Sequence, residues 1–178
     1  MHDTTIDYVF DSLADLPPRE SVVEIGARGS NLVFRAYCRN AKYIAVDIQA
    51  DEGIDVVGNG HDYFPEEPVD TVICCSVLEH EEYPENLILS MFNMLKSEGV
   101  LILTAQSDPW PTHSGYGDGS VFFEWEHYKN ISLSDLLAWM QPYFIIKDAE
   151  YRNSGDVLVT GVRRHDTSPP LHRGKYIR

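Results

Sequence analysis

The sequence predicts an α/β fold, a mostly parallel sheet with helices on both faces. Short apolar runs rich in β-branched residues, such as 21–26, 43–48 and 100–104, alternate with stretches that have helical apolar spacing. This alternation is typical of parallel strands that are covered on both sides. Near the C-terminus two such runs follow one another, joined by the polar, glycine-containing segment 152–156. That junction indicates a hairpin, and therefore one antiparallel strand.

In the first half of the chain, apolar side chains at helical spacing run up to Pro17 and Pro18, which end the first helix. The segment 48–54, between the second and third strands, is too short for a full crossover helix, so the helix there should be reduced. The third strand is weak. The helices expected here are 4–16 and 30–39, and the strands are 21–26, 43–48 and 55–57.

The second half adds four strands and two helices. Leu87, Ile88 and Met91 fall on one stripe of a helix that Glu98 and Gly99 should end. A hydroxyl side chain at position 132 suits the N-cap of the last helix. The strands expected here are 70–75, 100–104, 143–151 and 157–162, and the helices are 84–96 and 132–141.

The segment 106–131 is long for a loop without structure of its own, and long loops in compact domains are usually functional. It contains Pro109, Trp110 and Pro111, followed by three glycines at alternate positions from 115 to 119. We expect a lid or substrate loop there.

Composition narrows the class of protein. The chain has 178 residues, with 43% apolar and 24% charged, which suits one soluble domain over 1–165 followed by a basic tail over 166–178. No apolar run approaches the roughly 20 residues that a membrane span needs, and no signal peptide is recognisable, so no membrane partner is expected. The 14 Lys and Arg against 28 Asp and Glu give a net charge of −14, which makes nucleic acid an unlikely partner. The composition does not decide whether the chain forms a homo-oligomer.

Three cysteines, Cys38, Cys74 and Cys75, have neither disulfide nor zinc spacing. A reducing, cytoplasmic location is the simplest interpretation, and no metal is expected.

Two features at the ends of the first two strands point to a nucleotide-like ligand. The turn Glu24-x-Gly26-x-x-Gly29-Ser30 lets backbone approach a ligand at a helix start, although a structural turn explains it equally well. Asp47 ends the second strand, where a carboxylate can accept hydrogen bonds from both ribose hydroxyls. Either a nicotinamide dinucleotide or S-adenosylmethionine would satisfy this arrangement.

The segments that follow the third and fourth strands distinguish the two ligands. With Asn59-Gly60-His61-Asp62 and Ser76-Val77-Leu78-Glu79-His80, the chain resembles class I S-adenosylmethionine-dependent methyltransferases of the type 11-like group, which includes quinone- and sterol-modifying enzymes. The segment from Leu95 to Leu101 looks like the segment that leads into the fifth strand in this family. The resemblance runs over 22–104 and more loosely to 162. It implies a Rossmann-like, doubly wound, seven-stranded sheet with an antiparallel last strand.

The resemblance also implies which residues bind S-adenosylmethionine. Asp47 would hold the ribose, Ile48 would lie against adenine, and Glu24 would face the methionine part. Arg28 and Ser30 stand where the family usually has glycine, and Asn59 stands where it usually has aspartate. The full implied set is Glu24, Gly26, Ala27, Arg28, Gly29, Asp47, Ile48, Asn59, Gly60, His61, Cys75 and Ser76.

His80 is the candidate general base, because it follows the fourth strand at the edge where open α/β sheets bind ligands. An equally good interpretation is that it orients a loop. The residues of the long loop that are candidates for acceptor contact are His113, Tyr116, Trp125 and His127.

The sequence thus predicts methyl transfer to a hydroxyl or amine of a small-molecule or sugar-like acceptor. Two alternatives remain at this point. One is a nucleic-acid or nucleotide methyltransferase that uses the basic tail, and the other is a non-catalytic relative that binds cofactor or serves as a scaffold.

Overall fold

The computed structural model describes residues 3–165, and the basic tail expected over 166–178 lies outside them. The strands are β1 (Ser21–Ile25), β2 (Lys42–Asp47), β3 (Val56–Val57), β4 (Val69–Cys75), β5 (Leu95–Gln106), β6 (Phe144–Arg152) and β7 (Asp156–Arg163). The helices are α1 (Asp3–Ala14), α2 (Asn31–Tyr37), the 3₁₀ turn η1 (Leu78–His80), α3 (Pro84–Met94) and α4 (Leu133–Met140).

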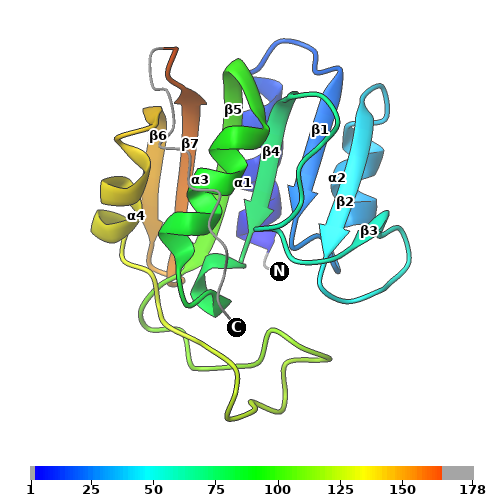
Figure 1. The fold of residues 1–178 in the computed structure, drawn as a ribbon. Coiled ribbons are helices and arrows are strands. Elements are labelled where there is room, and N and C mark those ends of the chain that lie inside the picture. The colour runs from blue at the N-terminus through cyan, green and yellow to red at the C-terminus, as the bar shows by residue number, and fades with distance from the viewer. Residues whose placement is uncertain (1–2, 166–178) are drawn as a thin grey trace.

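The strands form one sheet in the order β3-β2-β1-β4-β5-β7-β6, in which β7 runs antiparallel to both of its neighbours (Figure 1). The predicted fold class is confirmed. β1 pairs with β2 on one side and with β4 on the other, and all three are parallel. Their carboxyl ends therefore meet at one edge, where the strand order reverses, which is the place where doubly wound sheets bind ligands.

Helices cover both faces of the sheet: α3 and α4 lie on one face, and α1 and α2 on the other (Figure 1). Phe92 and Met140 pack into the first of these layers, whereas Val9 and Phe34 pack into the second. As expected, no helix forms over 48–54. Of the helices in the described part of the chain, none is long and apolar enough to cross a membrane.

The largest difference from the predicted boundaries lies at the junction of α3 and β5. Helix α3 ends at Met94 rather than at 96, because Leu95 is buried and already pairs with Val69 as the start of β5. The strand is then interrupted at Glu98, which has a left-handed φ of 62°, and resumes opposite Thr71 at Val100. The sequence prediction gave no helical turn after β4, where the structure has the 3₁₀ turn η1 that ends at His80.

Candidate active site

A cavity of about 550 Å³ lies at the carboxyl edge of the sheet. One side consists of the turns that follow β1, β2, β3 and β4, and we call it the turn side. The other side consists of η1, the two residues after it and the segment 106–127, and we call it the loop side. The predicted site residues that line this cavity are Gly26, Arg28, Asp47, Ile48, Asn59, Gly60, Cys75, Ser76, His80, His113, Tyr116, Trp125 and His127. The predicted residues that do not line it are Glu24, Ala27, Gly29 and His61.

Two glycines shape the turn side. Gly26 has a φ of +71°, and a Cβ built there would lie 2.0 Å from Cγ2 of Val77. At Gly60 a Cβ would lie 2.5 Å from Cγ2 of Ile25. Any side chain at either position would displace its neighbour, so bare backbone forms this part of the wall.

Asp47 is the acidic group on the turn side and is only 8% exposed. Its Oδ2 accepts a hydrogen bond from the backbone N–H of Arg28 at 3.0 Å, and its Oδ1 accepts one from the N–H of Gln49 at 2.9 Å. Each carboxylate oxygen has a second lone pair. The carboxylate is therefore held in a fixed orientation and still has room for two hydroxyl donors.

Glu24 lies beneath this wall rather than in it. Its fully buried carboxylate accepts hydrogen bonds from the hydroxyls of Ser30 and Tyr43, which ties β1 to β2 and to the start of α2. Burial raises the pKa of Glu24 to about 7, although both hydrogen bonds act against the rise. The structure gives Glu24 a supporting position under the glycine turn, where the resemblance implied contact with the methionine part.

His61 also supports the wall from behind. Its Nε2 lies 2.8 Å from Oε2 of Glu81, which does line the cavity. The side-chain oxygen of Asn59 accepts a hydrogen bond from the N–H of His61 at 2.9 Å and so closes its own turn.

His80 belongs to the loop side, and its ring packs edge-on against His113 and Tyr128 at centroid distances of 5.0 and 5.3 Å. Its Nδ1 is buried and has no hydrogen-bond partner among the described residues. Burial lowers the pKa of His80 to about 4, and nearby His113 contributes, whereas Glu126 and Glu81 act in the opposite direction. His80 is therefore a neutral imidazole near pH 7, with a lone pair that is able to accept a hydrogen bond.

The long loop crosses the cavity and is bonded to its turn side. Nη2 of Arg28 donates to the carbonyl of Gly117 at 2.7 Å. Gln49 donates from Nε2 to the carbonyl of Gly115 and accepts at Oε1 from the N–H of Gly117, both at 3.2 Å. The sequence prediction missed Gln49, because a contact with residues so distant along the chain leaves no local signal.

The loop is also closed on itself by Glu126. Its carboxylate accepts hydrogen bonds from the hydroxyl of Ser114, at 2.7 and 2.9 Å, and from the N–H groups of Gly115 and Phe123, at 3.1 and 3.0 Å. We call this cluster the Glu126 clasp. It fixes the loop conformation on the side that faces the cavity.

Cutting the loop contacts should loosen the loop. We expect Arg28→Ala to speed proteolytic cleavage within 106–131 by a few fold, because the guanidinium bond to Gly117 is lost. S-adenosylhomocysteine should slow this cleavage in the unmodified protein. Timed digestion followed by mass spectrometry of the fragments measures both effects. Arg39→Ala, at an exposed position near the end of α2, is the control, and equal cleavage of the two variants would contradict a lid held by Arg28.

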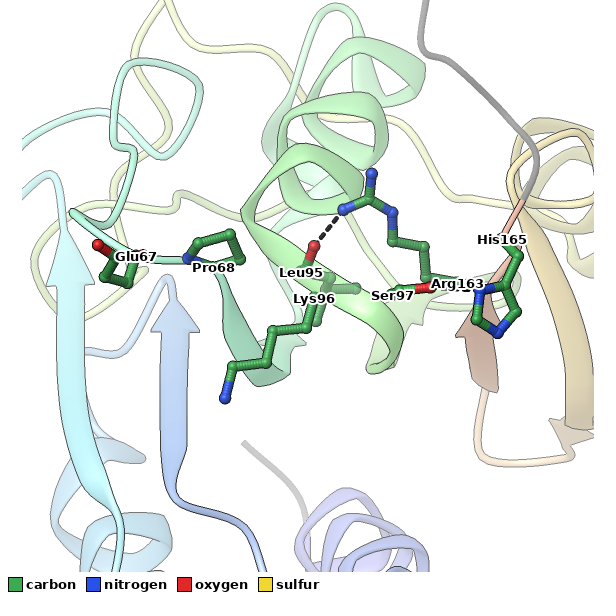
Figure 2. A pocket seen from close by; sticks show the side chains of 7 residues that line it. All are labelled: Glu67, Pro68, Leu95, Lys96, Ser97, Arg163 and His165. Atoms are coloured by element: carbon green, nitrogen blue, oxygen red, sulfur yellow. Dashed lines mark hydrogen bonds between the residues drawn. The ribbon is translucent and has the colours of Figure 1, made fainter.

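A second pocket, of about 360 Å³, lies at the opposite edge of the sheet, next to Pro68 and Leu95 (Figure 2). The basic side chains that line it within the described residues each have a partner in the protein. Lys96 pairs with Asp70 at 2.8 Å, and His165 lies 3.1 Å from Glu98. Arg163 donates to the carbonyl of Leu95 (Figure 2) and covers the ring of Phe92. This pocket lies at the opposite edge of the sheet from the switch point, and its basic side chains already bond to the protein.

A sequence model of a family described as a methyltransferase domain matches residues 4–143. The chain belongs to the methyltransferase domain family. No curated protein sequence matches it significantly. The predicted class, an S-adenosylmethionine-dependent methyltransferase of class I with S-adenosylmethionine as cofactor, is confirmed by this match and by the sheet order.

Solved structures share the fold at low sequence identity. An N1-methyltransferase of 1,6-didemethyltoxoflavin from Burkholderia thailandensis, with that compound and S-adenosylhomocysteine bound, aligns with a TM-score of 0.67 and 12% identity, over 92% of this chain and 78% of the other. The N-methyltransferase NodS from Bradyrhizobium japonicum, in complex with S-adenosylhomocysteine, gives 0.66 and 10%, over 92% and 87%. A complex of a Haloferax volcanii methyltransferase with the Trm112 methyltransferase activator gives 0.65 and 15%, over 92% of both chains.

Proposed function

We propose that this methyltransferase transfers the methyl group of S-adenosylmethionine to a hydroxyl or amine of a small-molecule or sugar-like acceptor. The single observation that carries the proposal is the continuity of the cavity. The same hollow is lined by Asp47 and Gly26 on the turn side and by His80 and Trp125 on the loop side. A donor on one side and an acceptor on the other would share one space closed off by the loop.

The residues of the turn side fit the cofactor. Asp47 would accept hydrogen bonds from the ribose hydroxyls, and Ile48, which is partly exposed in the cavity wall, would lie against the adenine. The glycine backbones at 26 and 60 leave room for close approach. When bound, the cofactor supplies a methyl group that is already activated on a sulfonium.

The loop side would align the acceptor and keep water out. Alignment and exclusion of water supply most of the rate gain when the electrophile is activated beforehand. The Glu126 clasp and the bonds from Arg28 and Gln49 hold the loop in position for this.

The charge of the wall argues against the nucleic-acid alternative. Glu81, Glu82 and Asp118 line the cavity, and Arg28, the only Lys or Arg that the described residues contribute to it, is bonded to Gly117. A phosphate backbone near these carboxylates would be repelled. The basic tail on which the alternative depends lies outside the described residues.

Asp47→Ala should weaken binding of S-adenosylhomocysteine by about 30-fold, which corresponds to the roughly 2 kcal/mol expected for hydrogen bonds to a charged acceptor. Calorimetric titration measures the change. Asp51→Ala, at an exposed position in the same segment, should leave the dissociation constant unaltered. An unaltered constant for Asp47→Ala would remove this residue from the site. No binding by the unmodified protein at millimolar cofactor would favour the non-catalytic alternative.

A further inference from the structure

We propose that the acceptor of this enzyme is an amine that enters the cavity as a cation, and that Glu82 and Trp125 select it. The inference rests on the proposed function and narrows its acceptor from a hydroxyl or amine to an amine. Three features of the loop side support it: the sign of its charges, its aromatic surface and the chemistry of its histidine.

The charges on the cavity wall are almost all negative. The carboxylates that line it are those of Asp47, Glu81, Glu82, Asp118 and Glu126. Some of them already have partners within the protein: Asp47 holds two backbone N–H groups, Glu81 faces His61, and Glu126 forms the clasp. Glu82 is exposed in the wall, where its carboxylate accepts a hydrogen bond from Tyr83 and keeps further lone pairs for an incoming cation.

Within the described part of the chain, Arg28 is the only Lys or Arg that lines the cavity, and its single charge stands against five carboxylates. Arg28 donates to Gly117, and the pKa of His80 is lowered to about 4, so that its ring carries no charge near pH 7. An anionic acceptor would therefore face repulsion with little compensation, whereas an ammonium group would be attracted.

The aromatic surface of the loop side suits the same ligand. Trp125 is 66% exposed and lines the cavity. Its ring stacks on Phe123 at a centroid distance of 5.5 Å and meets Tyr116 edge-on at 4.9 Å. The Glu126 clasp is adjacent in sequence and limits how far this group can move. An indole face held in this way attracts a cation and also offers apolar contact.

His80 favours an amine over an alcohol. An alcohol holds its proton strongly and needs a base to become a good nucleophile, whereas a neutral amine has its own lone pair. The groups that face His80 are His113 and Tyr128, which pack against its ring, and the side chains of Glu81, Glu126 and His127. With a pKa near 4 the imidazole is too weak a base for an alcohol. Its Nδ1 is buried against Gly115, so His80 contributes an uncharged ring to the cavity wall and not a base.

The reaction balances without a further reagent. The ammonium first loses one proton to water. The nitrogen lone pair then forms the bond to the methyl carbon as the bond from that carbon to sulfur breaks, and the electron pair goes to sulfur. The methylated nitrogen carries the positive charge that the sulfonium loses.

The test uses three probes of one shape and different charge: benzylamine, benzyl alcohol and benzoate. Each is titrated, by ligand-observed NMR, into the full chain saturated with S-adenosylhomocysteine. We expect benzylamine to bind at least tenfold more tightly than benzyl alcohol, and benzoate to show no saturable binding. Equal affinity for the amine and the alcohol, or tighter binding of benzoate, would overturn the inference while leaving the proposed function intact. Failure of S-adenosylhomocysteine to bind at all would overturn both.

Two variants identify the selecting residues. Glu82→Gln should weaken benzylamine binding by roughly three- to fivefold, as expected for a partly solvated ion pair, and leave benzyl alcohol binding unchanged. Trp125→Leu should weaken both probes, but benzylamine more. Glu85→Gln, an exposed carboxylate at the start of α3 that does not line the cavity, is the matched control. Equal effects of the Glu82 and Glu85 substitutions on benzylamine would show that only the overall charge of the protein matters and would overturn the role of Glu82.

Discussion

Gly26→Ala should weaken binding of S-adenosylhomocysteine by 100-fold or more, equivalent to about 3 kcal/mol. A Cβ at this position would lie 2.0 Å from Cγ2 of Val77, so one of the two segments has to move. Val77 caps η1, and its displacement would shift His80 and narrow the cavity from both sides. The left-handed φ of +71° adds a strain of roughly 1–2 kcal/mol for any residue with a Cβ. Calorimetric titration and urea unfolding separate the loss of affinity from the loss of stability.

Gly29→Ala is the matched control for this substitution. Gly29 also has a left-handed φ, of +84°, but a Cβ there would meet nothing within 4 Å. The Gly29→Ala substitution should lower the free energy of unfolding by about 1 kcal/mol. It should change the affinity for S-adenosylhomocysteine by less than tenfold. Adding Val77→Ala to Gly26→Ala should recover part of the binding, because the clashing methyl group is removed. Equal losses of affinity for the Gly26 and Gly29 variants would show that backbone strain, and not the clash, controls binding.

The strand pattern was predictable because it depends on local sequence. Continuous apolar runs predict buried parallel strands wherever helices cover both faces, and the polar junction at 152–156 predicts the final hairpin. The carboxyl edge of the sheet follows from the strand directions alone. The sequence alone therefore places Asp47 and Gly26 at the same edge.

Contacts between distant segments were not predictable in the same way. Glu24 looked like a ligand-facing acid, yet two hydroxyls, from Ser30 and Tyr43, hold it beneath the wall. The bonds from Gln49 to Gly115 and Gly117 join two irregular segments, and irregular segments have no periodicity to interpret. Helix α3 stops early because Leu95 has a partner in β4, which its own neighbours in sequence do not reveal.

Glu79→Gln should change how stability depends on pH. Glu79 is fully buried in η1, and burial raises its pKa to about 8, with nearby Asp156 adding to the rise and backbone hydrogen bonds opposing it. In the unfolded chain the same carboxyl ionises near pH 4.3. Between about pH 5 and pH 8 the unfolded state has therefore lost this proton while the folded state keeps it. The folded state then binds more protons than the unfolded state, so stability falls as pH rises, by about 1.4 kcal/mol per pH unit and about 4 kcal/mol across that range.

The amide that Glu79→Gln introduces cannot ionise, so this part of the decline should vanish in the variant. Glu24, with a pKa raised to about 7, acts in the same direction and should remain as a smaller slope. Urea unfolding at pH values from about 5 to 8 gives the free energies of unfolding, and the variant should be less stable than the unmodified protein near pH 5 and more stable near pH 8. Glu66→Gln, at an exposed position, should leave the curve unchanged. Parallel curves for the unmodified protein and Glu79→Gln would mean that folding does not raise the pKa of the Glu79 carboxyl.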